Sequence, residues 1–282
     1  MCSLDCVLQL EFGNAIILTW EIPAMTQPVW NGRCDPQAPL LVIGAGRSGS
    51  SLLARIFGAH PAMCFHDEND FLTPQLWQLL WENRRPRAFP GMETSQTALT
   101  DREAALIQRL ASLLPQLLVS ILGIDATCTH WGFKEVWNGS ATHRYSWDIY
   151  DLLFPRATWV HLVRHPFEFA ASCAAWNNDA FTESYLEARL SDWTAMVEYS
   201  RLRATQERFF EVRHEDIVTS PRHTLEPVFE SLGLDWSEAC ARAVKRPVMV
   251  SERQREKEQT LLRSFRRSKA LAKTAASLGY VL

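Results

Sequence analysis

The sequence predicts an α/β fold with a central, mainly parallel sheet flanked by helices, and two observations carry this prediction. From about residue 40 onward, apolar runs with strand character alternate with helical patterns, which is typical of a parallel sheet covered by helices. The first run, residues 40–44, leads into a turn rich in glycine and serine and then into a helix start. A strand, a tight glycine-containing turn and a helix N-terminus in that order form a cradle for an anion.

The individual elements follow from hydrophobic periodicity along the chain. We expect short strands within residues 5–22 and a surface loop at 86–95, and we expect the sheet strands near 40–44, 62–65, 129–133, 157–163 and 208–212. The helical pattern predicts helices over 50–59, 71–84, 101–122, 145–153, 167–176, 183–206, 221–232 and 237–244.

The chain divides into three predicted parts. Residues 1–38 form an N-terminal extension of strand and loop, and residues 39–245 form the α/β domain. Residues 246–282 form a basic helical segment that packs on the same domain. Its stretch 261–273 carries five basic residues and no acid, which fits either a solvated helix face or an anion-binding flap.

Composition excludes several classes of function. A chain of 282 residues with 47% hydrophobic and 22% charged residues is an ordinary globular protein. The formal net charge of −3 indicates no general attraction to nucleic acid or to anionic membranes, so anion binding must come from local clusters. The apolar run 16–22 is far too short for a membrane span, and no basic-then-apolar signal precedes it. We therefore expect a cytoplasmic protein without a membrane span.

The cysteine pattern predicts reduced thiols. Seven cysteines, an odd number, are scattered without CxxC spacing, and a disulfide framework is unusual in a chain this long. His161 and His165 stand four residues apart, but a path from strand to loop does not place them on one helical face. We therefore expect no metal site.

The glycine-rich turn has the spacing of a nucleotide phosphate loop but lacks its lysine. Gly44 and Gly49 are separated by four residues, and the lysine expected after Gly49 is Ser50. This difference argues against ordinary ATP chemistry. The candidate phosphate binders in the turn are Gly46, Arg47, Ser48, Gly49, Ser50 and Ser51.

Charged residues follow the other predicted strands. His66, Asp67 and Glu68 follow the second strand, Lys134 and Glu135 follow the third, and Arg164 closes the fourth. Because ligands of parallel sheets bind beyond the carboxyl ends of the strands, these residues are expected to share one edge. Cations, hydroxyls and an acid on one edge suit a multiply anionic substrate and a proton acceptor, although any one of them can be a solvated loop charge.

A second anion motif lies at the fourth strand. Arg164 is followed by Pro166, which suits a helix start, and Ser172 lies two turns along that helix. Arginine offers a planar fork of donors to a phosphate, and the serine hydroxyl adds one more. Without the first loop, this pair is equally well explained by a structural ion pair.

Together these motifs resemble the sulfotransferase superfamily that uses 3′-phosphoadenosine 5′-phosphosulfate (PAPS), over about residues 39–235. Residues 44–53 are similar to its 5′-phosphosulfate loop, and residues 161–166 with Ser172 are similar to its 3′-phosphate motif. Residues 210–218, followed by Pro221 and a helix that ends in Ser-Leu-Gly-Leu, resemble its later strand and helix, and the motifs are most similar to those of tyrosylprotein and carbohydrate sulfotransferases. The resemblance implies a three-layer P-loop fold, PAPS as the sulfuryl donor, PAP as the product and no metal.

The resemblance also implies roles for single residues. Glu68 matches the general base, and the neighbouring Asp67 and His66 stay open as alternatives. Arg47 and Lys134 match cations that stabilise the charge on the leaving phosphate. The sequence departs from the family at Glu135, where a proline is expected, and it lacks the Arg-Lys-Gly motif that closes over the nucleotide in cytosolic members.

The acceptor is left open by the sequence. Sulfuryl transfer to a hydroxyl or amine of a carbohydrate or another small molecule is expected, and Trp77 and Trp81 are candidates for stacking on a ring. Two other functions stay possible: a P-loop kinase that uses ATP, and a PAP-binding relative without catalytic activity.

Overall fold

The centre of the molecule is a five-stranded sheet in which every neighbouring pair is parallel. The computed structural model describes residue 30 and residues 32–67, 101–137, 150–151, 153–177, 182–244 and 269–281. The strand order is β2-β3-β1-β4-β5. The strands are β1 (Leu40–Ala45), β2 (Met63–His66), β3 (His130–Trp137), β4 (Thr158–Val163) and β5 (Phe209–Arg213). The predicted α/β class is confirmed.

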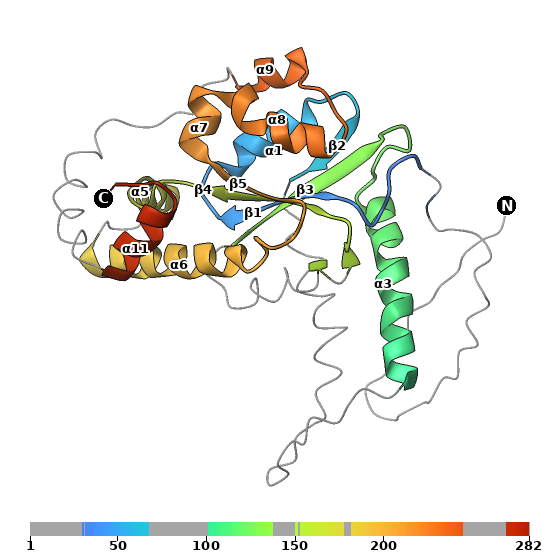
Figure 1. The fold of residues 1–282 in the computed structure, drawn as a ribbon, viewed down its shortest axis with the longest axis horizontal. Coiled ribbons are helices and arrows are strands. Elements are labelled where there is room, and N and C mark those ends of the chain that lie inside the picture. The colour runs from blue at the N-terminus through green and yellow to red at the C-terminus, as the bar shows by residue number, and fades with distance from the viewer. Residues whose placement is uncertain are drawn as a thin grey trace, which may run out of the picture.

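Helices cover both faces of this sheet and make three layers (Figure 1). One face is covered by α1 (Ser50–Gly58), α7 (His214–Thr219), α8 (Pro221–Ser231) and α9 (Glu238–Val244). The other is covered by α5 (Pro166–Asn177), α6 (Glu183–Arg201) and α11 (Lys269–Ser277), and α3 (Asp101–Ile121) adds side chains to the same core.

The two cores follow from the alternation of side chains along the strands. On β1, Leu41 and Ile43 pack with α5 and α6, whereas Leu40 and Val42 pack with α1 and α8. All six residues of β1 are buried, as expected for a strand of a parallel sheet that is covered on both faces.

Several predicted elements differ from the structure or lie outside the described residues. Helix α7 was not predicted, since its six residues are too few for a clear helical period. Strand β3 continues to Trp137 and not only to residue 133. The strands predicted within 5–22 and the helix over 71–84 lie outside the described residues, and only residues 150, 151 and 153 of the helix over 145–153 are described.

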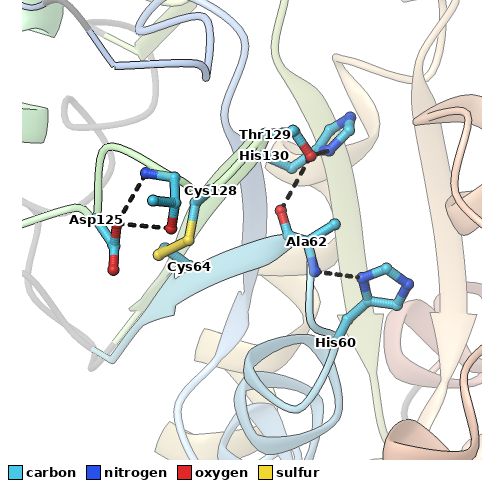
Figure 2. The surroundings of a disulfide bond; sticks show 8 residues. His60, Ala62, Cys64, Asp125, Cys128, Thr129 and His130 are labelled. Atoms are coloured by element: carbon cyan, nitrogen blue, oxygen red, sulfur yellow. Dashed lines mark hydrogen bonds between the residues drawn. A yellow bond between two sulfur atoms is a disulfide. The ribbon is translucent and has the colours of Figure 1, made fainter.

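The prediction that the cysteines are reduced is wrong for one pair. Cys64 on β2 and Cys128 just before β3 form a disulfide, with Cα atoms 6.0 Å apart (Figure 2). The residues are 64 positions apart in sequence, so only the pairing of β2 with β3 brings them together. Cys34, Cys173 and Cys240 are free and buried, as predicted.

Membrane-spanning helices and clusters of metal ligands are both absent from the described residues. No helix in that part of the chain combines the length and the apolar character that crossing a membrane requires. The same part contains no group of three or more His, Cys, Asp or Glu side chains that could hold a metal ion.

Candidate nucleotide-binding site

The two predicted anion motifs lie side by side at the carboxyl edge of the sheet. Strands β1 and β4 are parallel neighbours, so the turn after β1 and the loop after β4 emerge together. Arg164 Nη1 donates a hydrogen bond to the carbonyl oxygen of Arg47 at 3.2 Å. The two motifs are therefore joined by a direct contact.

Close approach of neighbouring backbone and side chains explains two glycines of the turn, Gly44 and Gly49. A Cβ on Gly44 would lie 2.4 Å from the carbonyl oxygen of Leu162 on β4. A Cβ on Gly49 would lie 2.2 Å from Nδ1 of His214, and Gly49 has a φ of +101°, which L residues rarely adopt. The spacing recognised in the sequence thus has a local steric cause.

The turn presents donors that are free to meet a ligand as far as the described residues show. Helix α1 begins at Ser50, and the first amide N–H groups of a helix have no intrahelical acceptor. Ser48 and Ser50 are buried, and within the described part of the chain no group bonds to the buried Oγ of Ser48. A buried hydroxyl without a partner costs free energy, which an anionic ligand can recover.

Arg164 is held at the site by its backbone, while its guanidinium is only partly engaged. Trp193 Nε1 on α6 donates to the Arg164 carbonyl at 3.1 Å. The side chain is 15% exposed and reaches Glu168 only at 3.5 Å. Its Nε is buried and, among the described residues, meets no acceptor. Ser172 lies on α5, two turns after Arg164, and is half-buried.

Lys134 lies inside β3 and not after its end, because the strand is longer than predicted. Its side chain is buried, and its Nζ donates to Ser51 Oγ at 3.2 Å and pairs with Asp67 at 3.1 Å. Lys134 therefore connects the glycine-rich turn and the start of α1 to the end of β2. Glu135 points to the other face, where its carboxylate accepts a hydrogen bond from Tyr150.

The candidates for a proton acceptor follow β2. His66 is the last residue of that strand, and Asp67 comes next with its carboxylate already engaged by Lys134. Glu68 lies outside the described residues.

His214 is a site residue to which the sequence analysis assigned no role. It begins α7, directly after β5, and its Nδ1 faces Gly49. That nitrogen is buried and finds no partner within the described residues. Burial, together with the charge of Arg164, lowers the pKa of His214, so the imidazole is neutral near pH 7. The only signal in the sequence is its position at the end of a strand.

Glu215 and Tyr280 hold the loop that carries Arg164 in place. Glu215 accepts hydrogen bonds from the His165 backbone N–H and from the Tyr280 hydroxyl, both at 2.9 Å. Burial alone would raise the pKa of Glu215, but these bonds outweigh it and lower the pKa. Arg213 lies over the Tyr280 ring at 4.4 Å. Nothing in the sequence indicates the bond between Tyr280 and Glu215, because it joins residues 65 positions apart.

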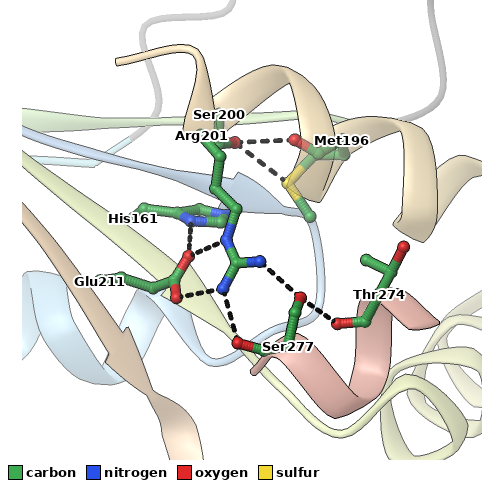
Figure 3. A network of polar contacts seen from close by, with 7 residues as sticks. All are labelled: His161, Met196, Ser200, Arg201, Glu211, Thr274 and Ser277. Carbon is green, nitrogen blue, oxygen red and sulfur yellow. Dashed lines mark hydrogen bonds and ion pairs between the residues drawn. The ribbon is translucent and has the colours of Figure 1, made fainter. Parts of the chain in front are cut away.

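A polar network that joins α6, β5 and α11 has a structural role (Figure 3). Arg201 on α6 binds both carboxylate oxygens of Glu211 on β5, at 2.7 and 2.8 Å, and also binds Ser277 at the end of α11. Glu211 also pairs with the buried His161. Burial would raise the pKa of Glu211, but the bonds from Arg201 and His161 lower it to about 2. The network ties α11 to the sheet.

Comparison with known proteins decides the family. The family model described as "Sulfotransferase family" matches residues 39–238. The chain belongs to the sulfotransferase family. No curated protein sequence matched this sulfotransferase.

Two solved structures share its fold. A sulfotransferase domain from the curacin biosynthetic pathway is 14% identical with a TM-score of 0.54, over 87% of this chain and 98% of that one. A sulfotransferase domain from the olefin synthase of Synechococcus PCC 7002 is 19% identical with a TM-score of 0.54, over 89% and 97%. The predicted three-layer fold of the superfamily is thus confirmed.

Proposed function

We propose that this sulfotransferase transfers a sulfuryl group from PAPS to a hydroxyl or amine of an acceptor. The phosphate loop, residues 46–51, would bind the 5′-phosphosulfate, and Arg164 with Ser172 would bind the 3′-phosphate. The single observation that carries the proposal is the hydrogen bond from Arg164 to the Arg47 carbonyl, because it puts the two anion motifs within reach of one nucleotide.

The proposed reaction is an in-line displacement at sulfur. The acceptor oxygen or nitrogen attacks the sulfur and loses its proton to a base, while the bond from sulfur to the phosphate oxygen breaks and PAP leaves with the electron pair. Arg47 and Lys134 stabilise the charge that develops on the phosphate. We assign the base to Glu68, with His66 as the alternative. Asp67 is better suited to holding Lys134, since the two already form an ion pair.

The donor is tested by replacing Arg164. We expect Arg164→Ala to weaken PAP binding by about 100-fold, because a hydrogen-bonded charge pair is lost from a largely buried position. Isothermal titration calorimetry of the wild type, Arg164→Ala and Arg164→Lys measures this effect. Unchanged PAP affinity in Arg164→Ala would refute the assignment, and turnover of ATP with Mg²⁺ but not of PAPS would favour a kinase.

The base is tested separately. Glu68→Gln is expected to keep PAP binding and to lose turnover of PAPS with a panel of hydroxyl and amine acceptors. His66→Gln is the matched comparison. A fully active Glu68→Gln enzyme would move the role to His66. Tight PAP binding by the wild type without transfer to any acceptor would favour an inactive, PAP-binding relative.

The compartment is a separate question. The disulfide between Cys64 and Cys128 weighs against the predicted cytoplasmic location, because disulfides persist mainly in oxidising compartments. Thiol labelling of the protein under native conditions in its own cell tests this point. Labelling of both cysteines would favour the cytoplasm.

A further inference from the structure

We propose that Trp176 is a positioning residue for Arg47, and that α5 thereby couples the two ends of the nucleotide site. The inference rests on the proposed function, since it concerns how Arg47 is presented to the phosphosulfate. The Arg47 guanidinium carbon lies 4.2 Å from the centroid of the Trp176 ring. This is well within the range of a cation–π interaction.

Burial does not account for the position of this tryptophan. Trp176 is 70% exposed on the last turn of α5. An exposed tryptophan gains little hydrophobic free energy from packing, so its contacts are of interest. Its ring lies against the guanidinium of Arg47, a residue of the phosphate loop, which points to a role at the site.

Arg47 has an unusual backbone conformation and a long side chain with many rotamers. Its φ of +71° lies in the left-handed region, which is uncommon for a residue with a side chain. Its carbonyl is held by Arg164, whereas the residue as a whole is exposed. Arginine loses considerable rotamer freedom when it is ordered, so contact with Trp176 lets Arg47 meet the charge that develops on the phosphate without losing that freedom during the chemical step.

One face of α5 serves both ends of the site. Glu168, Ser172 and Trp176 follow one another at four-residue spacing and therefore lie on successive turns of the same face. Glu168 pairs with Arg164, Ser172 is the proposed ligand of the 3′-phosphate, and Trp176 holds Arg47. Movement of α5 would thus shift both cations together.

A double-mutant cycle tests the proposal. Trp176→Leu is expected to lower kcat with PAPS about two- to fivefold, the range of an exposed cation–π contact, while the Kd of PAP changes less than twofold. Trp176→Phe should recover most of the loss. In an Arg47→Ala background, Trp176→Leu should have no further effect. Leu117→Ala, which removes another exposed apolar side chain, is the control and should keep wild-type kcat.

Equal effects of Trp176→Leu in both backgrounds would overturn the proposal. A rise confined to the KM of the acceptor would also overturn it, since it would identify Trp176 as an acceptor contact.

The contact itself can be tested without nucleotide. In protein labelled with fluorotryptophan, the Trp176 resonance, assigned with Trp176→Phe, should shift in Arg47→Ala and stay in place in Lys273→Ala. An unchanged resonance in Arg47→Ala would overturn the inference whatever the donor proves to be. Failure of the wild type to bind PAP, with that shift present, would count against the donor alone.

Discussion

Arg164 and Arg201 are the same residue type in one fold, and they differ in how their donors are used. Arg201 makes four hydrogen bonds, to Glu211 and to Ser277, at 2.6 to 3.1 Å. Arg164 reaches one carbonyl and, at 3.5 Å, one carboxylate, and its buried Nε meets no acceptor among the described residues. An arginine whose donors are satisfied by its own chain stabilises the fold, whereas one with spare, oriented donors is available to a ligand.

The largest effect expected from this comparison is on stability. Arg201→Ala should reduce the free energy of unfolding by about 2 kcal/mol, because it removes two hydrogen bonds from the partly exposed Glu211 carboxylate and two from Ser277. Urea denaturation measures the loss. PAP affinity, measured under conditions where the variant stays folded, should change less than twofold. A large loss of PAP affinity with little loss of stability would reverse the distinction between the two arginines.

Acid should weaken the structural network in two steps. Burial lowers the folded-state pKa of His161, so its stabilising effect is complete above the unfolded value of about 6.5 and declines as the pH falls below it. For one histidine the decline is at most about 1.4 kcal/mol per pH unit. Glu211, with a pKa of about 2, adds a second loss as the pH falls from the ordinary carboxyl value of about 4.5 toward 2. Urea midpoints from about pH 8 down to about pH 3 follow the first step and the onset of the second, and His161→Gln should flatten the first step.

At the phosphate loop, stability and binding should change in opposite directions. Ser48→Ala removes a buried hydroxyl that has no partner in the described part of the chain, so the free protein should be unchanged or more stable by up to about 1 kcal/mol. PAP affinity should fall about tenfold, the value of one hydrogen bond to a phosphate. Thermal unfolding with and without PAP measures both. Lower stability of the free variant would show that Ser48 has a structural partner.

The smallest effect is expected at Tyr280, which contacts the loop that carries Arg164 through Glu215. Tyr280→Phe removes the hydroxyl that donates to Glu215 and should weaken PAP binding about two- to fivefold, because Glu215 holds the backbone N–H next to Arg164. The Tyr280 ring stays, so its contact with Arg213 is kept. Calorimetry of Tyr280→Phe beside Glu215→Gln measures the effect. Wild-type affinity in both variants would show that Tyr280 and Glu215 do not support the loop that carries Arg164.

Most of the fold could be predicted because its signals are local. The strands near 40–44 and 157–163 are short apolar runs, and the helices that follow them begin at a glycine-serine turn and at a proline. Arg47, Ser48 and Arg164 could be selected because the ends of parallel strands share an edge. Lys134 was put after its strand although it lies within β3, since periodicity does not give strand ends to within a few residues, and its role stays a prediction.

The sequence by itself therefore determined the strand–helix alternation, the glycine-rich turn between β1 and α1 and the candidate ligands, because each depends on residues close together in the chain. Only the tertiary structure decided which polar groups pair with one another. The Cys64–Cys128 disulfide, the Arg201–Glu211–Ser277 network, the Tyr280–Glu215 bond and the Arg47–Trp176 contact join residues brought together by sheet pairing and helix packing. No periodicity or spacing encodes such contacts, since they depend on the global path of the chain.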